Sequence, residues 1–208
     1  RPCSDTRQQR TAARVGALDI GFTANGVDAI LNHGGKLKVV FLAGADDIST
    51  KALADTFSVY VGSHGDHGVA HADVILPAAA YAEKPGTWVN MEGRVQRGYR
   101  AVFAPGEARE DWSIYRALSD VLGVTLPYDN IDALRARIAA EWPHLGSEGL
   151  TASAWGDFGG DAKLEGGAIR LPVTNFYTTN AIARASETMA ECVAQILNGH
   201  EPALQAAE

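Results

Sequence analysis

The chain has 208 residues, of which 46% are hydrophobic and 21% are charged, as in an ordinary globular protein that is long enough to bury a substantial core. Its net charge of -7 argues against binding to nucleic acid or to an anionic membrane surface, because both need a basic face. No apolar run approaches the roughly 18 residues that indicate a membrane span, so we expect no direct membrane insertion.

The first half of the chain alternates between helical patterns and short apolar runs. Residues 1–12 are expected to form an irregular amino-terminal end. The elements predicted after it are a helix at Val27–His33, a buried parallel strand at Leu37–Ala43, a helix from Ser49 to about Phe57, and strands at Ser58–Val61 and Asp73–Leu76. Because a helix between two neighbouring strands joins them in parallel, this order predicts a Rossmann-like parallel sheet with flanking helices.

The second half changes its period several times. Apolar and polar residues alternate from Thr87 to Arg97, as in one half-exposed strand. The elements predicted beyond it are a helix at Trp112–Leu122 capped by Asp111, a helix at Ile131–Trp142, a flexible loop at 146–167, a strand at Ala168–Val173 and a helix at Ile182–Leu197. The predicted fold class is therefore α/β over residues 13–145 with a small appended α+β section, and residues 168–208 are expected to pack on the same domain.

The chain contains two cysteines, Cys3 and Cys192, which lie near opposite ends of the sequence. A typical iron–sulfur cluster uses four cysteine thiolates, as does a zinc site with four cysteine ligands. The cysteine count therefore predicts that the chain carries no such centre. It also favours a reducing compartment, because a disulfide framework needs more cysteines.

The loop after the second predicted strand, GSHGDHGVAH at residues 62–71, holds the densest group of polar side chains. His64, His67 and His71 are three and four residues apart, so a helix would bring them to one face as possible zinc ligands. Gly65 and Gly68 disfavour such a helix. A metal site is therefore the first of three interpretations of this loop.

A phosphate site is the second interpretation, because Gly62 and the two later glycines follow a parallel strand, where backbone amides often approach a pyrophosphate. The spacing differs from GxGxxG, however, and Ser58–Glu83 contains no lysine or arginine. In the third interpretation the histidines bind no ligand, but hydrogen-bond the loop backbone and help to fix the sheet edge. The residues by themselves favour this structural role and leave the other two open.

A predicted tight turn at Pro85-Gly86 is flanked by Glu83, Glu92 and Arg94. Arg94 could bind an anion or pair with one of these glutamates, and pairing is favoured because an arginine among carboxylates on one sheet face usually pairs with them. The sequence contains neither the nucleophile elbow GxSxG nor the P-loop GxxxxGK[ST], the usual apparatus of acyl and phosphoryl transfer. No catalytic residue is therefore assigned.

The segment ADVILPAAAYAEKPGTWVNMEGRVQ, Ala72–Gln96, resembles a signature of the molybdopterin-dependent oxidoreductases. The matching residues are Asp73, Leu76, Pro77, Glu83, Gly86, Thr87, Asn90, Glu92, Gly93, Arg94 and Gln96. Within that superfamily, residues 61–96 look most like the large iron–sulfur subunit of respiratory complex I, the 75-kDa type. The segment LPVTNFYTTNAIARASETMAEC, Leu171–Cys192, resembles the same subunit in alphaproteobacteria and mitochondria, with Ala181 where proline is expected.

The resemblance implies a carboxy-terminal, molybdopterin oxidoreductase-like region that binds no molybdenum cofactor. It also implies that the [4Fe-4S] and [2Fe-2S] clusters of the family lie in an amino-terminal part that this chain lacks. In the cofactor-binding relatives the loop equivalent to Gly62–Ala72 contacts the pterin. The residues expected to be vestiges of such a pterin site are Gly62, Ser63, His64, Gly65, Asn90, Glu92 and Arg94.

Three functions are consistent with these features. The favoured one is a structural section of NADH:quinone oxidoreductase, inactive alone and in contact with other peripheral-arm subunits. The resemblance implies a peripheral location on the cytoplasmic face of the bacterial inner membrane or on the matrix side of the mitochondrial inner membrane. The alternatives are a pterin-binding fragment of an oxidoreductase similar to formate dehydrogenase, and an unrelated metal enzyme that uses the three histidines.

Overall fold

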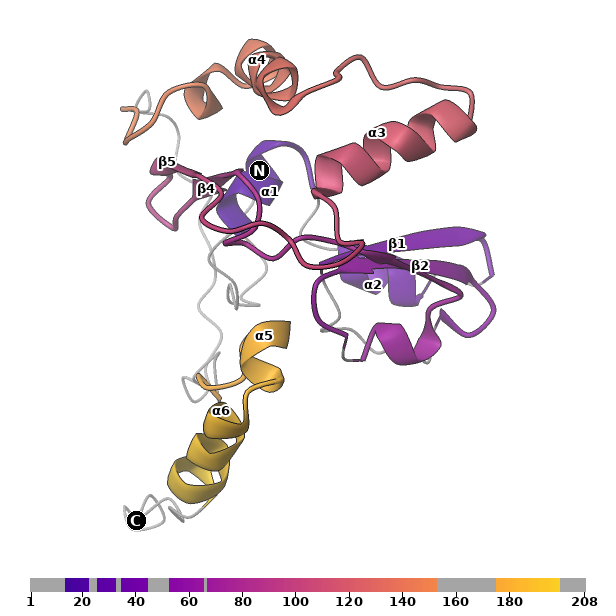
Figure 1. The fold of residues 1–208 in the computed structure, drawn as a ribbon, viewed down its shortest axis with the longest axis vertical. Coiled ribbons are helices and arrows are strands. Elements are labelled where there is room, and N and C mark those ends of the chain that lie inside the picture. Colours follow the sequence, from indigo (N-terminus) through magenta and orange to yellow (C-terminus); the bar gives the residue numbers. More distant parts are fainter. Residues whose placement is uncertain are drawn as a thin grey trace, which may run out of the picture. The chain divides into compact units, whose positions relative to one another are not determined.

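The computed structural model describes residues 14–22, 26–32, 35–44, 53–65, 67–152 and 175–198. The chain divides into two compact units, a larger unit of residues 12–153 and a smaller unit of residues 1–11 and 154–208. The elements of the larger unit (Figure 1) are α1 (Arg14–Asp19), α2 (Gly26–Leu31), β1 (Val39–Ala43), β2 (Phe57–Gly62), η2 (Val69–His71), β3 (Val74–Pro77), β4 (Gly86–Val89), β5 (Val95–Gly98), α3 (Asp111–Val121), α4 (Ile131–Glu141) and η3 (Pro143–Leu145). None of the helices in these described segments is long and apolar enough to cross a membrane.

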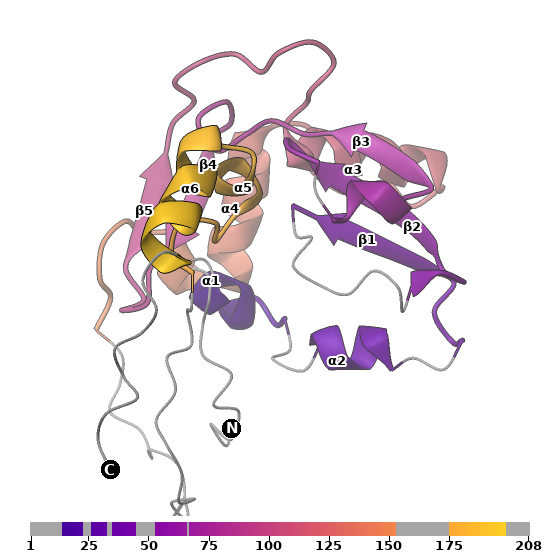
Figure 2. The ribbon, with the colours of Figure 1, turned by 90° about the horizontal axis from the view of Figure 1, so that it is seen from below.

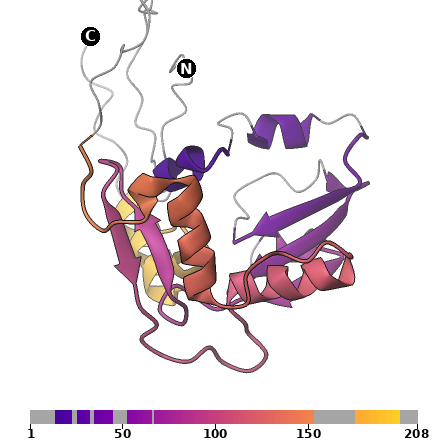
Figure 3. The same cartoon turned by 90° about the horizontal axis from the view of Figure 1, so that it is seen from above.

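A three-stranded parallel sheet in the order β1-β2-β3 forms the centre of the larger unit. Val39 of β1 lies opposite Phe57 of β2, and Val59 of β2 lies opposite Val74 of β3. Figure 3 shows α2 and α3 on opposite sides of these strands. The predicted α/β class, with a parallel sheet and flanking helices, is therefore confirmed, and the appended part contains a small antiparallel pair, β4 and β5.

Side chains on one face of the sheet pack toward α2. Val40, Leu42, Leu53 and Tyr60 are buried there and contact Ile30 of α2. The alternation along β1 follows from the strand geometry, since successive side chains point to opposite faces. This face therefore forms a closed apolar layer under the loop that follows β2.

The opposite face of the sheet packs against α3 (Figure 2). Val59, Val61 and Ala78 are buried there and contact Ile114 and Tyr115 of α3. The parallel sheet thus has a helix on each side, as parallel sheets require because both of their faces are apolar.

The alternating segment Thr87–Arg97 is not one strand, so that prediction was wrong. It forms an antiparallel hairpin of β4 and β5. The Asn90 side-chain oxygen accepts the backbone N–H groups of Glu92, at 3.0 Å, and Arg94, at 2.9 Å. Gly93 has φ of 84°, a conformation that glycine adopts at little cost. Both arms of the hairpin keep the period of two, so the alternation hides the turn between them.

Near β2 one predicted helix does not extend as far as expected, and at the chain start the structure has a helix that was not predicted. Ser49–Ala52 lie outside the described residues, but the predicted helix does not reach Phe57, which begins β2. The Thr56 N–H donates to the Leu53 carbonyl at 2.9 Å, a turn that ends the preceding segment. The helix α1 was not predicted, because its six residues show too short a pattern to stand out.

The two predicted helices that follow the hairpin are both present, as α3 and α4. Asp111 does not cap α3 as predicted: the residue at the cap position is Glu110, and Asp111 is the first helical residue. Its carboxylate instead forms an ion pair with Lys84. In α4 the Asn130 side chain accepts the Ala133 N–H at 2.8 Å, which fixes the start of that helix.

In the smaller unit, the predicted single helix at Ile182–Leu197 is divided, so this prediction was wrong. The elements are α5 (Ala181–Arg184), α6 (Glu187–Cys192) and a π-helix at Val193–Leu197. The Ser186 side chain accepts the Met189 N–H at 3.4 Å, and this cap starts a new helix. The predicted strand at Ala168–Val173 and residues 153–167 of the predicted loop lie outside the described residues.

Tyr115 of α3 has a buried hydroxyl without a hydrogen-bond partner among the described residues. We predict that Tyr115→Phe raises the free energy of unfolding by about 1 kcal/mol, because it removes an unsatisfied polar group and keeps the ring. Denaturant unfolding at neutral pH measures this difference. Tyr99→Phe is the matched control, since Tyr99 is 72% exposed and should change little.

Tyr115 should also make the free energy of unfolding depend on pH. Burial, and secondarily the charge of Asp111, raises the pKa of Tyr115 above its ordinary value of 10.0. Above that pH the unfolded chain loses the phenol proton before the folded chain does. The stability of the wild type should therefore fall as pH rises through this range, and Tyr115→Phe should fall less. An equal fall in both proteins would contradict the assignment.

Candidate functional site

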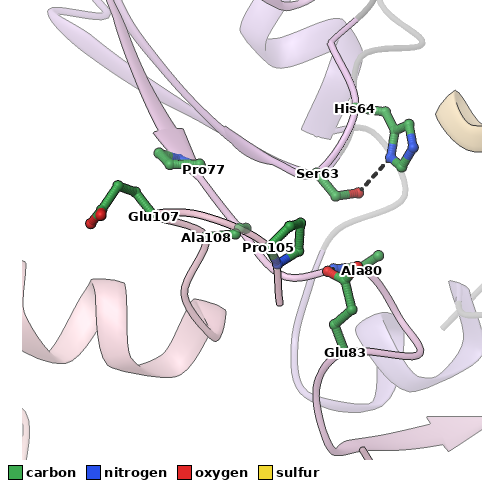
Figure 4. A pocket seen from close by; sticks show the side chains of 9 residues that line it. Ser63, His64, Pro77, Ala80, Glu83, Pro105, Glu107 and Ala108 are labelled. Atoms are coloured by element: carbon green, nitrogen blue, oxygen red, sulfur yellow. Dashed lines mark hydrogen bonds between the residues drawn. The ribbon is translucent and has the colours of Figure 1, made fainter. Parts of the chain in front are cut away.

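A cavity of about 360 Å³ opens at the carboxyl ends of β2 and β3, which is the usual ligand position in a parallel sheet. The residues that line it, shown in Figure 4, are Ser63, His64, Pro77, Ala78, Ala80, Glu83, Pro105, Glu107 and Ala108. Its volume is in the range of small-molecule sites. This cavity is therefore the first place to test for ligand chemistry.

The polar groups of the cavity are few and are already hydrogen-bonded. The Ser63 hydroxyl lies 3.0 Å from Nδ1 of His64. Glu83 accepts the backbone N–H of Ala80 at 2.9 Å. Glu107 points away from the other labelled side chains in Figure 4 and is 89% exposed. None of the described residues that line the cavity is a lysine or arginine, so an anionic ligand finds no fixed positive charge there.

A second cavity of about 320 Å³ shares Glu83 with the first and is lined in part by Arg100 and Arg109. The Arg100 guanidinium lies 4.5 Å over the ring of Phe103. The Arg109 guanidinium lies 3.2 Å from the Glu107 carboxylate. Both cations are therefore engaged with groups of this chain, which lowers their capacity to bind a phosphate.

The side chain of Tyr60 explains why position 62, where the loop begins, is occupied by a glycine. A Cβ atom added to Gly62 would lie 2.6 Å from Cζ of Tyr60 and nearer still to its hydroxyl, closer than real contacts allow. That hydroxyl donates to the His64 carbonyl at 2.5 Å, and Tyr60 is 2% exposed. Gly65 is similar, since its Cβ would lie 2.7 Å from Cγ2 of Val69. Packing against Tyr60 and Val69 therefore accounts for both glycines without a ligand.

The three histidines of the loop do not share a helix face. Only His71 lies in regular structure, at the end of the short helix η2, while His64 and His67 precede it in turns. In the part of the chain that the structure describes, no group of three histidine, cysteine, aspartate or glutamate residues is arranged to hold a metal ion. Asp66, which lies between His64 and His67 in the sequence, is outside the described residues.

Two backbone carbonyl groups of this loop are bonded to side chains of β2. The Ser58 hydroxyl donates to the His71 carbonyl at 3.0 Å, as the hydroxyl of Tyr60 does to the carbonyl of His64. Asp73 completes the anchor, because its Oδ2 accepts the Ser58 N–H at 2.7 Å and lies 3.3 Å from the hydroxyl. The loop therefore closes onto β2 through two of its carbonyls, the Asp73 carboxylate and the Asp73 N–H, which donates to the Ser58 carbonyl at 2.9 Å.

The remaining predicted site residues, Asn90, Glu92 and Arg94, lie in the β4–β5 turn and do not line the cavity. Asn90 shapes the turn, as described above. Arg94 Nε lies 3.7 Å from Glu92 Oε2, and both side chains are exposed. This confirms the predicted salt bridge. The structure therefore places the loop candidates Ser63 and His64 at the cavity and the other three residues elsewhere.

One contributor to the cavity was missed from the sequence, the segment that begins at Pro105. It reaches the cavity through backbone pairing of Arg109: its N–H donates to the Pro77 carbonyl at 3.1 Å, and its carbonyl accepts the Ala79 N–H at 2.8 Å. Such pairing between distant segments has no local sequence signal.

Comparison with known proteins defines the class to which this fold and cavity belong. Residues 7–121 match the family described as Molybdopterin oxidoreductase, and the chain therefore belongs to this family. Residues 142–192 match a second family, which describes the carboxy-terminal part of one NADH-ubiquinone oxidoreductase subunit. Within its class, the sequence corresponds to the carboxy-terminal region of the 75/78-kDa subunit of complex I, as the resemblance predicted.

Three relatives illustrate this correspondence. The chain is 43% identical over 196 residues to the mitochondrial NADH-ubiquinone oxidoreductase 78 kDa subunit of Candida albicans, covering 88% of this chain and 26% of that protein. It is 42% identical over 196 residues to the protein of the same name in Neurospora crassa, with 89% and 26% covered. For the 75 kDa subunit of Reclinomonas americana it is 43% identical over 190 residues, with 88% and 27% covered. The chain thus spans about a quarter of the length of these relatives.

Proposed function

We propose that this chain is a structural section of the iron–sulfur subunit of NADH:quinone oxidoreductase and carries no redox centre itself. In this proposal the iron–sulfur clusters lie in the rest of the subunit, and this section supports that cluster-bearing part. Its partners are the other peripheral-arm subunits, on the cytoplasmic face of a bacterial inner membrane or on the matrix side of a mitochondrial one. Neither electron transfer nor quinone chemistry is assigned to residues of this chain.

The observation that carries the proposal is the packing of Tyr60 into the loop that follows β2. The family implies a molybdopterin, whose phosphate needs a backbone cradle or fixed cations at this edge of the sheet. Here a Cβ on Gly62 would already collide with the Tyr60 hydroxyl, and the described lining residues of the first cavity include no lysine or arginine. The loop at Gly62 and the lining of the first cavity therefore do not fit a molybdopterin. No chemical step that uses this cofactor is assigned to the chain.

Elemental analysis of the purified chain, with its absorption spectrum, tests the proposal. We expect a colourless protein with molybdenum, tungsten and iron far below one atom per chain. Stoichiometric molybdenum or tungsten with bound pterin would overturn the proposal in favour of a pterin-dependent oxidoreductase. Stoichiometric zinc that is lost in His67→Ala would instead identify a metal enzyme. Glu92→Ala is the control variant, because its exposed side chain pairs with Arg94 in the hairpin turn.

A further inference from the structure

The first described helix, α1, depends on its contacts with the rest of the larger unit. A helix of six residues is marginal by itself, because its few backbone bonds do not offset the cost of nucleation. α1 packs against β4 (Figure 1), where Val15 joins an apolar cluster that includes Val89 and Leu145. Gly16 allows this close approach, since a Cβ atom there would lie 3.1 Å from Cγ2 of Val89. Apolar packing thus holds the first half of α1.

An ion pair holds the other end of α1. Nε2 of His144, in η3, lies 3.2 Å from Oδ2 of Asp19, the last residue of the helix. A carboxylate there adjoins carbonyl groups that have no partner within the helix, which is unfavourable unless a cation is near. The last turn of α1 contains no basic residue. Among the described side chains, the cation beside Asp19 is therefore the protonated form of His144.

The charged groups on the elements around η3 are paired with one another. Arg97 of β5 lies 3.9 Å from Glu148, which follows η3, and Arg137 of α4 lies 2.7 Å from Glu141. β4, against which α1 packs, has no charged residue. In the described part of the chain neither of these two pairs includes a member of the contact with α1. The charge of that contact is therefore set by the imidazole itself.

We infer that the contact between Asp19 and His144 is a pH-dependent clasp: protonated His144 holds α1 against the hairpin, and loss of the proton loosens the helix. Imidazole is the side chain that ordinarily changes its charge between about pH 5 and 8, while a carboxylate ordinarily stays ionised over that range. The attraction between unlike charges is therefore present at the acidic end and is lost as the pH rises. A neutral imidazole can still donate a hydrogen bond to the carboxylate, so α1 opens more often but the larger unit stays folded.

The clasp goes beyond the proposed function and does not depend on it, because both groups belong to this chain. Its effect is local. Each opening of α1 removes Val15 from the apolar cluster and uncovers Val89 and Leu145, which are each 6% exposed in the docked state. A rise in the pH of the surrounding compartment is thus converted into exposure of an apolar surface.

Hydrogen exchange of the full chain tests the clasp. The amides of Ile20 and Phe22 donate to carbonyls of α1 at 3.2 and 3.0 Å, so they report on the opening of its end. Protection factors, the ratio of intrinsic to observed exchange rate, correct for the effect of pH on the exchange chemistry. From about pH 5.5 to about pH 8 we expect these two factors to fall about threefold, the size of effect typical of a half-exposed charge contact. The amides of Leu122 and Val124, which donate to carbonyls of α3, should keep their protection.

Substitutions identify the two groups responsible. His144→Gln keeps a side-chain N–H donor but cannot become charged, so the pH dependence at the end of α1 should disappear. Asp19→Asn should have the same effect, because it removes the opposite charge. His71→Gln is the matched control, since it removes an exposed histidine from the loop after β2, and it should keep the pH dependence of the wild type. Denaturant unfolding at about pH 5.5 verifies that each variant is folded.

Three results would overturn the clasp. The first is a wild-type chain in which the protection of Ile20 and Phe22 is the same at both pH values. The second is a fall in His144→Gln or Asp19→Asn as large as in the wild type; if one of these variants does not fold, the other decides. The third is an equal fall for Leu122 and Val124, because the change would then be a global loss of stability rather than the opening of α1.

Discussion

Replacing Gly62 with alanine should lower the free energy of unfolding of the larger unit by about 2 kcal/mol, the cost of forcing an extra methyl group into a packed site. The new Cβ would collide with the hydroxyl of Tyr60 and lie 2.6 Å from its Cζ. Tyr60 cannot move aside freely, because it is 2% exposed and its hydroxyl is bonded to the His64 carbonyl. Urea unfolding of the purified chain measures the change.

A double-mutant cycle gives the control for this prediction. Tyr60→Ala alone opens a cavity, with a cost of about 3 kcal/mol or more. In the double variant Gly62→Ala/Tyr60→Ala the methyl group has room, so the cost of Gly62→Ala should largely disappear on the Tyr60→Ala background. If Gly62 serves a ligand instead, Gly62→Ala leaves the stability of the ligand-free chain unchanged, and the packing explanation is wrong.

Replacing Asp73 with alanine should also lower the free energy of unfolding by about 2 kcal/mol, because it leaves a buried backbone donor without an acceptor. The lost bond is the 2.7 Å contact from the Ser58 N–H to Asp73 Oδ2, at a residue that is 3% exposed. Chemical denaturation measures the loss. The loop after β2 should also become more sensitive to proteolysis, because Asp73 anchors its return to the sheet.

Ser58→Ala tests whether the loss of stability in Asp73→Ala comes from the bond to the Ser58 N–H or from any change near this loop. That variant removes the hydroxyl bonds to the His71 carbonyl and to Asp73, but keeps the N–H bond, so it should cost only about 1 kcal/mol. Glu92→Ala, in an exposed ion pair, should cost about 0.5 kcal/mol or less. If Asp73→Ala is no more harmful than Glu92→Ala, Asp73 does not hold the loop.

The second prediction concerns the segment by which the family is recognised from the sequence, Ala72–Gln96. Several of its signature residues have structural duties in this chain: Asp73 anchors a loop, Asn90 shapes a turn and Glu83 accepts a backbone N–H. Such duties persist whether or not a cofactor is bound, because they fix backbone geometry. This explains how a family signature can be retained in a chain for which we propose no redox centre.

The sequence by itself determined the parallel strands, the helices α3 and α4, and the family. Short apolar runs such as the one in β1 are recognisable because strands of parallel sheets carry apolar side chains on both faces. The helical spacing after Asn130 is equally local, since residues three and four apart share one helix face. The signature from Ala72 to Gln96 spans β3, β4 and the start of β5, so a single pattern carried much of the assignment.

Only the tertiary structure decided what those residues do. The alternation around Asn90 is the same for one strand as for the two arms of a hairpin, and the turn is visible only through side-chain bonds to its backbone. The glycines after β2 could serve a phosphate or a neighbour's packing, and the position of Tyr60 favours packing. The segment at Pro105 reaches the cavity by pairing with distant residues. In each case the deciding contact depends on the conformation of the folded backbone, about which sequence periodicity carries no information.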